Sequence, residues 1–198
     1  ADLMAPTSGF AIVGYAGRFP GATDAEEFWQ VLREGRDTIS EVPKDRWDVD
    51  EFFDPEPGAP GKVVTRRAGF VDDIRGFDAP FFGMSAREVR LMDPQHRMLL
   101  ETAWQAIEHS GTAPTSLADS NTGVFVGIST HDYLGMAFGE LTYPEVEAYL
   151  GIGTSNAAAA GRISYRLGLQ GPSVAVDTAC SSSLVAIHQA CQALRLGE

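Results

Sequence analysis

The sequence predicts an α/β fold, and three observations carry that prediction. Residues 122–129 form an apolar, β-rich run without alternating polarity, which is typical of a strand covered on both faces. Residues 173–177 form a second short apolar strand. A helical pattern of apolar residues follows that strand from residue 184. Strands buried on both faces, next to amphipathic helices, indicate a sheet between helical layers.

The length of 198 residues is enough for a domain that buries its own core. Residues 1–8 contain small residues and Pro6 with no periodicity, so we expect a linker there and a structured domain over residues 9–198. The apolar run 10–13 is expected to be the first buried strand of that domain.

A glycine-rich stretch follows at residues 14–21. It bears only a faint likeness to a dinucleotide-binding loop, because Pro20 and Gly21 stand where the helix that holds a pyrophosphate should begin. The stretch therefore predicts a tight turn rather than a cofactor site.

The first helix is predicted to begin after Thr23, which has capping-box spacing with Glu26. It should end near Gly35. The apolar face of this helix consists of Phe28, Val31 and Leu32.

Three later helices have clear signals. Ser85 and Glu88 repeat the capping-box spacing, and Pro94 marks the first turn of an amphipathic helix that ends at Gly111. A helix rich in small residues is predicted over residues 156–167.

Residues 42–62 have no clean periodicity, four prolines and irregularly spaced acids. No Ca²⁺-loop pattern fits these acids. We expect a long surface excursion with a solvated face, rather than a metal site.

The charge balance excludes several classes of partner. Fifteen Lys and Arg against 27 Asp and Glu give a net charge of −12, so the basic surface of a nucleic-acid-binding domain is missing and anionic membranes are disfavoured. No run approaches the ~18 apolar residues of a membrane span, and the first residues lack the features of a signal peptide. The expected compartment is the cytoplasm.

The two cysteines, Cys180 and Cys191, stand eleven residues apart in one predicted helix. The rise of a helix separates them by about 16 Å. A disulfide needs Cα atoms within ~7 Å, so both are expected to be free thiols.

Cys180 stands where the buried strand 173–177 gives way to a helix, which is the placement of a nucleophile at a sharp strand-to-helix turn. A helix N-terminus favours a thiolate and an oxyanion. The alternative is a small buried hydrophobic residue, and this is the interpretation we give to Cys191.

The segment around this cysteine resembles a known family. Residues 177–186, Asp-Thr-Ala-Cys-Ser-Ser-Ser-Leu-Val-Ala, resemble the active-site segment of β-ketoacyl synthases, the condensing domains of polyketide and fatty acid synthases. The early segments and the acidic loop resemble the multidomain type I polyketide synthases. The supporting segments are residues 13–21, 46–48, 76–83, 92–101 and 161–165.

The resemblance implies a thiolase-like fold, of which this chain supplies the first half of a duplicated, layered α/β core. It implies an acyltransferase activity in which Cys180 accepts the growing chain as a thioester from the phosphopantetheine arm of an acyl carrier protein. A malonyl-type extender on a second carrier then undergoes decarboxylative Claisen condensation with that thioester. This half is expected to bind no cofactor or metal of its own.

The family's two histidine segments, His-Gly-Thr-Gly-Thr and Asn-x-Gly-His, are absent from the 198 residues, and the sequence stops just after the nucleophile's helix. We therefore expect the N-terminal half of a synthase domain, which needs the C-terminal half and is inactive alone. His188 is about 12 Å along the helix from Cys180 and cannot touch it. His96 and His109 are expected at surface or packing positions, and His131 is the one histidine near a strand end.

Two alternatives remain open from the sequence. A thiol hydrolase or acyltransferase also uses a nucleophile at such a turn, but its usual Gly-x-Ser-x-Gly frame is missing here, and the residues that flank Cys180 are Ala179 and Ser181. A noncatalytic, synthase-like dimer subunit is the second alternative, and the resemblance opposes it because such subunits characteristically replace the cysteine.

The resemblance also implies a homodimer. We expect either the strand 173–176 or an apolar loop at residues 133–138 to be buried against a second copy. A local basic patch would dock the acidic carrier protein. The candidates are Lys62 with Arg66 and Arg67, and Arg87 with Arg90.

Overall fold

The structure, a computed structural model, describes residues 9–140 and 148–198. The chain forms two compact units. The larger contains Arg75–Glu198 with residues 9–15, and the smaller is Ala16–Ile74. The linker expected at residues 1–8 lies outside the described residues.

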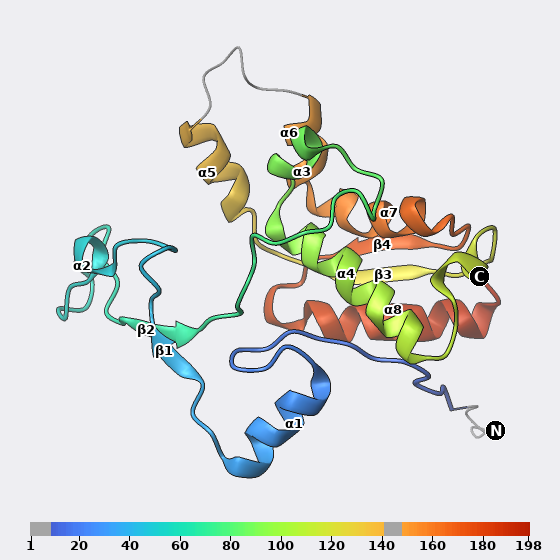
Figure 1. Ribbon diagram of the computed structural model, residues 1–198, viewed down its shortest axis with the longest axis horizontal. Coiled ribbons are helices and arrows are strands. Elements are labelled where there is room, and N and C mark those ends of the chain that lie inside the picture. The colour runs from blue at the N-terminus through green and yellow to red at the C-terminus, as the bar shows by residue number, and fades with distance from the viewer. Residues whose placement is uncertain (1–8, 141–147) are drawn as a thin grey trace, which may run out of the picture. The chain divides into compact units, whose positions relative to one another are not determined.

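The centre of the larger unit is a pair of parallel strands, β3 (Val124–Gly127) and β4 (Ser173–Val176), in which Gly127 lies opposite Val176. The helices α7 (Asn156–Leu167) and α8 (Ser182–Leu196) cover this pair from opposite sides (Figure 1). Parallel strands between helical layers confirm the predicted α/β class.

The helix predicted to start at Pro94 is α4 (Pro94–His109), which packs on α7. Its N-cap is Asp93, whose carboxylate accepts from the Gln95 backbone N–H at 2.8 Å. Ser85 caps α3 (Ala86–Arg90) by accepting from the Glu88 backbone N–H at 3.1 Å, which confirms the second predicted capping box.

The core lies between α4, α7 and the two strands. Burial of each large aliphatic side chain there stabilises the fold by about 1.5–3 kcal/mol. The residues of this core are Met84, Met92, Leu100, Val126, Ile128, Ala159, Ala160, Ile163, Leu167 and Leu169.

A buried ion pair joins α7 to α3. The Arg162 guanidinium donates to the Glu88 carboxylate at 2.7 Å, and the two side chains are only 8% and 20% exposed. Arg166, one turn further along α7, lies 3.9 Å from the other oxygen of Glu88.

The helix α8, which follows Cys180, has two unlike faces. Small residues, among them Ala186 and Ala193, are buried on the side that faces the strands. Leu184, Ile187 and Leu194 recur at helical spacing on another side and are 73%, 60% and 64% exposed.

The prediction of a loop at residues 133–138 was wrong, because these residues belong to the helix α5 (Asp132–Glu140). A single glycine costs a helix only about 1 kcal/mol, which tertiary contacts override. One such contact is the Tyr133 hydroxyl, which donates to the Arg90 carbonyl at 2.6 Å. The helix α6 (Ala148–Thr154) and the 3₁₀ turn η1 (Pro114–Leu117) complete this unit.

The expected buried strand at residues 10–13 was also wrong. The segment forms no strand in the structure, and Ile12 and Val13 are 88% and 74% exposed. Apolar β-formers need a neighbouring strand to pair with, and the described sheets offer these residues none.

The smaller unit contains α1 (Ala25–Glu34) and an antiparallel pair, β1 (Ile39–Glu41) with β2 (Arg67–Gly69). The N-cap of α1 is Asp24, one residue later than predicted, because its carboxylate accepts from the Glu27 backbone N–H at 2.8 Å. Gly35 ends the helix in the left-handed conformation, as expected.

The acidic excursion at residues 42–62 contains one short helix, α2 (Val49–Phe52). Asp48 of this excursion caps α2, and Asp50 accepts from Arg66 at 2.6 Å. Arg66 also donates to Glu41 of β1 at 2.9 Å. Over residues 9–140 and 148–198, no group of three or more His, Cys, Asp or Glu could hold a metal ion.

Candidate functional site

Cys180 lies in a single 3₁₀ turn, η3 (Ala179–Ser181), between the end of β4 and the start of α8. The residue is exposed, and both cysteines are free. The predicted strand, turn and helix around Cys180 are therefore confirmed. The buried-hydrophobe alternative does not fit an exposed residue.

The backbone is strained next to the cysteine. Ala179 has φ of 53°, in the left-handed region that disfavours side chains with a Cβ. Its N–H donates to the Asp177 carboxylate at 3.0 Å. Strain of this kind persists only where the surroundings impose it, and it is common at functional sites.

The hydroxyl of Ser182 supports the same turn from the other side. It donates to the Ala179 carbonyl at 2.7 Å and accepts from the Thr178 backbone N–H at 2.9 Å. Ser182 is buried, whereas Ser181 is exposed and bonds only to Thr178.

The strand β3 approaches this turn closely. A Cβ placed on Gly127 would lie 2.7 Å from the Ser182 carbonyl carbon and from the Ser183 backbone nitrogen. Only glycine leaves room for the first turn of α8 at this position.

The loop after β3 leaves the same edge of the sheet as Cys180, because the two strands are parallel and end in register. His131 lies on this loop, and its Nε2 is 3.4 Å from the Asn156 amide nitrogen. Gln95 donates to the Thr130 hydroxyl at 3.3 Å and so ties the loop to α4. Among the described residues, His131 pairs with Asn156 and not with the Cys180 thiol.

Among the described residues, no hydrogen bond joins any of the other histidines to the Cys180 thiol. His188 is exposed on α8, and the Nδ1 of His109 accepts from the Tyr15 backbone N–H at 3.3 Å. His96 is 1% exposed, and neither of its ring nitrogens has a hydrogen-bond partner. The pKa of His96 is lowered to about 4, mainly by burial; Asp93 opposes this shift and Arg162 adds to it.

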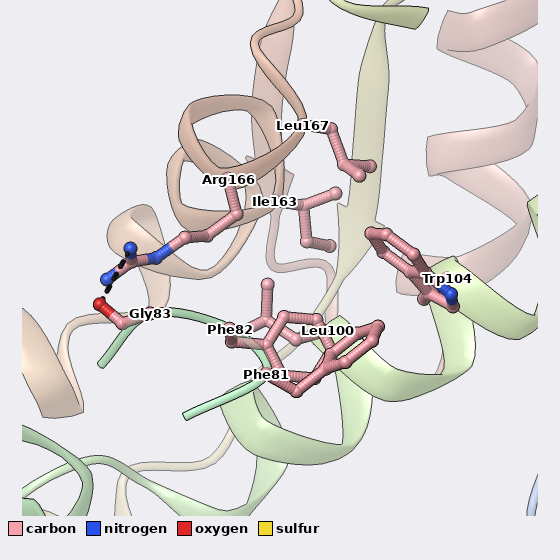
Figure 2. Close-up of a pocket in the computed structure, with 8 residues that line it drawn as sticks. All are labelled: Phe81, Phe82, Gly83, Leu100, Trp104, Ile163, Arg166 and Leu167. Carbon is pink, nitrogen blue, oxygen red and sulfur yellow. Dashed lines mark hydrogen bonds between the residues drawn. The ribbon is translucent and has the colours of Figure 1, made fainter. Parts of the chain in front are cut away.

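A cavity of about 260 Å³ lies apart from Cys180 (Figure 2). Aromatic rings form one wall, with Phe81 and Trp104 packed edge to face at 4.8 Å. The Arg166 side chain crosses its rim and donates to the Gly83 carbonyl at 3.3 Å. Because no residue of the Cys180 turn lines this cavity, it is not where the thiol would meet a substrate.

Sequence reasoning singled out Cys180 but gave no role to Asp177, Ser182 or Gly127. An Asp two residues before a turn amide is a known turn signal, so Asp177 could have been found. The roles of Ser182 and Gly127 depend on contacts across the turn and between elements, which the sequence does not display.

None of the helices that the structure describes is both long and apolar enough to cross a membrane. The arrangement presents an exposed thiol on a rigid, hydrogen-bonded turn ahead of a 15-residue helix. Such a thiol can attack an electrophilic carbonyl carbon.

The sequence matches the family model "Beta-ketoacyl synthase, N-terminal domain" over residues 8–198. It is 57% identical, over all 198 residues, to a phenolphthiocerol/phthiocerol polyketide synthase protein of Mycobacterium tuberculosis, of which it spans 11%. It is 50% identical over 190 residues to a mycocerosic acid synthase-like polyketide synthase of Mycolicibacterium smegmatis, spanning 95% of this chain and 9% of that protein.

Solved structures give the same result. The oxazolomycin ketosynthase domain of Streptomyces albus superposes with a TM-score of 0.85 at 45% identity, over 94% of this chain and 32% of that one. A ketosynthase from module 6 of the bacillaene synthase of Bacillus subtilis superposes with a TM-score of 0.82 at 42% identity, over 94% of this chain and 30% of that one. The chain thus spans about a third of the solved domains and about a tenth of the curated relatives.

Proposed function

Because the chain belongs to the β-ketoacyl synthase family and has the thiolase-like fold of its ketosynthase relatives, we propose that it is the nucleophile-bearing half of a polyketide synthase ketosynthase. The observation that carries the proposal is Cys180, exposed on a strained turn between β4 and α8. In this proposal residues 9–198 are the N-terminal half of the domain.

The first step is acyl loading. The Cys180 thiolate attacks the carbonyl carbon of an acyl thioester carried on the phosphopantetheine arm of an acyl carrier protein. The C–S bond to the carrier breaks, the carrier sulfur leaves as a thiolate and takes up the proton that the Cys180 thiol had given up, and the acyl group stays on Cys180. The backbone N–H of Cys180 would stabilise the oxyanion of the tetrahedral intermediate.

The second step is condensation. A malonyl-type extender on a second carrier loses CO₂, and its α-carbon attacks the acyl–Cys180 carbonyl. The new C–C bond replaces the C–S bond and regenerates the thiol. The family assigns decarboxylation to two histidine segments that these 198 residues do not contain. We therefore propose that this half alone does not condense, and that the C-terminal half supplies those histidines.

The surface of α8 supports the need for a second half. Leu184, Ile187 and Leu194 are large apolar side chains left exposed on the helix that carries the nucleophile. An apolar face of this kind is normally covered by another element. We propose that the C-terminal half covers it.

The carrier protein and a second copy of the chain are the remaining proposed partners. In the expected carrier patch at Lys62, Arg66 and Arg67, the two arginines pair with acids and the lysine does not. Arg66 pairs with two acids, Arg67 lies 3.7 Å from Asp37, and Lys62 donates to a carbonyl. We propose that the carrier docks at one of the two predicted basic patches, this one or Arg87 with Arg90 of α3. For the dimer, β4 remains the candidate because it pairs with β3 along one edge and with no other described strand.

Mass spectrometry tests the loading step. The chain, combined with the C-terminal half of its domain, is incubated with an acyl N-acetylcysteamine thioester and digested for peptide mapping. We expect one acyl group on the Cys180 peptide, its loss in Cys180→Ser, and its retention in the matched control Cys191→Ser. Acylation of both cysteines to the same extent, or of neither, would contradict the proposal. Rapid release of the loaded acid to water would instead favour a thiol hydrolase.

A further inference from the structure

Ala179 is an unusual residue for the conformation it adopts. Among the described non-glycine residues, positive φ occurs at Asp73, Asp119 and Ala179. Aspartate enters the left-handed region comparatively easily, because its short polar side chain can bond locally. Alanine has no such compensation, so contacts from outside the residue must hold Ala179 in place.

Two side chains supply these contacts, one at each end of the residue. The Asp177 carboxylate accepts from the Ala179 N–H at 3.0 Å, and the Ser182 hydroxyl donates to the Ala179 carbonyl at 2.7 Å. Both peptide groups that flank the Ala179 Cα are therefore fixed. Their orientation sets φ and ψ of Ala179, and with them the direction in which the next residue, Cys180, leaves the turn.

The Ser182 hydroxyl makes two contacts with the turn. Ser182 is 5% exposed, and its hydroxyl also accepts from the Thr178 backbone N–H at 2.9 Å. Loss of this hydroxyl would remove the partner of the Thr178 amide and of the Ala179 carbonyl at once. The next residue, Ser183, is exposed and makes no such bond.

We propose that Asp177 and Ser182 are positioning residues, which clamp Ala179 in the left-handed conformation and so hold the Cys180 thiol at the N-terminal end of α8. The proposal deepens the loading function proposed above. The clamp itself is a property of the turn and can be tested without any acyl donor.

The test measures the alkylation rate of Cys180 by iodoacetamide, peptide by peptide, with Cys191 of the same chain as the internal reference. The variants are Ser182→Ala, Asp177→Ala and the conservative pair Ser182→Thr and Asp177→Asn, which keep the hydroxyl and the amide-accepting oxygen. Ser183→Ala is the matched control. Each is also combined with Ala179→Gly, because glycine adopts a positive φ without strain.

We expect Ser182→Ala and Asp177→Ala to slow alkylation of Cys180 about two- to fivefold, the factor that an anion gains at a helix N-terminus. Cys191 should be unaffected, and Ser183→Ala should leave both rates unchanged. The conservative variants should keep the wild-type rate. In the Ala179→Gly background, Ser182→Ala should change the alkylation rate of Cys180 by less than about twofold. A difference of that size is within the deviation from additivity that is usual for independent sites.

Several outcomes would overturn the clamp. One is an effect of Ser182→Ala that is undiminished in Ala179→Gly; another is equal slowing by Ser183→Ala. A parallel rise in both cysteine rates would mean general loosening of the fold. If Ser182→Ala does not fold, the exposed Asp177 gives the same test through Asp177→Ala and Asp177→Asn. A further outcome is that the variants give the expected alkylation rates while wild-type Cys180 takes no acyl group from a thioester. In that case the proposed function is wrong and the clamp is still supported.

Discussion

Gly127 of β3 and Ser182 of α8 touch through their backbones, so that a Cβ on Gly127 would lie 2.7 Å from the Ser182 carbonyl carbon. Ser182 is also the residue whose hydroxyl holds the turn around Cys180. The strand β3 therefore supports the turn around Cys180 directly, with no side chain between them.

Gly127→Ala should push the first turn of α8 away from β3. We expect a loss of about 1–3 kcal/mol in the free energy of unfolding, as for other overpacked sites, measured by urea denaturation. Alkylation of Cys180 should change as well. The control is Gly161→Ala in α7, where an added Cβ meets nothing within 4 Å. That control should be neutral or stabilising by up to about 1 kcal/mol. If Gly127→Ala left the free energy of unfolding unchanged, the contact between β3 and α8 would not set the turn.

Stability should depend on pH through His96. Its folded pKa of about 4 lies below the ordinary 6.5, so the unfolded chain binds a proton in this range and the folded chain does not. The stability that this lowered pKa gives to the folded chain is fully present above pH 6.5. It is lost as the pH falls from there toward 4, and the free energy of unfolding is lower by about 2 kcal/mol at pH 5. Urea titrations between pH 5 and 8 measure it.

His96→Leu isolates this effect. Because neither ring nitrogen of His96 has a partner, the substitution removes no hydrogen bond and should leave stability at pH 7 almost unchanged. In this variant the free energy of unfolding should change less between pH 5 and pH 7 than in the wild type. His188→Gln, at an exposed position, should keep the wild-type slope. An equal slope in His96→Leu would place the titrating group elsewhere.

The ion pair of Arg162 and Glu88 should show strong coupling. Arg162→Met removes the closest partner of the Glu88 carboxylate, which is largely buried. We expect the free energy of unfolding to fall by about 3–5 kcal/mol. The double variant Arg162→Met, Glu88→Leu should recover most of that loss. As a contrast, the exposed pair of Arg36 and Glu34 should be worth less than about 1 kcal/mol, since solvent screens it. Additive losses in the double variant would show that the charges do not interact.

Ile187→Glu should weaken binding of the C-terminal half at least about tenfold, because burial of one isoleucine is worth about 1.5–3 kcal/mol. Isothermal titration calorimetry with the separately produced half would measure it. His188→Glu changes the neighbouring exposed residue and should bind like the wild type. Unfolding of the chain alone should be unaffected by Ile187→Glu, because the side chain is 60% exposed. Unchanged affinity would remove α8 from the proposed interface.

The elements with strong local signals could be predicted from the sequence. The capping serine Ser85, the N1 residue Pro94 and the left-handed Gly35 all act within one helical turn, so the local pattern was sufficient. The prediction of a strand at residues 10–13 was wrong, because a strand depends on pairing with a distant segment. The helix α5 was predicted as a loop, because it depends on tertiary contacts such as the hydrogen bond from the Tyr133 hydroxyl to the Arg90 carbonyl.

The candidate site divides in the same way. Cys180 could be found because the strand, the small-residue turn and the helix follow one another in the sequence. The left-handed Ala179 could not be found, since alanine carries no preference for that conformation and its φ is imposed by Asp177 and Ser182. The close approach of Gly127 depends on a contact between two separate elements.

The exposed leucines and isoleucine of α8 have a consequence during protein synthesis. Chains grow from the N-terminus at about 5–20 residues per second, and domains fold as units. In a protein whose C-terminal half follows this one, the ribosome completes α8 before the segment that covers it exists. Leu184, Ile187 and Leu194 then face the crowded cell for seconds, which makes this helix a target for chaperones during translation.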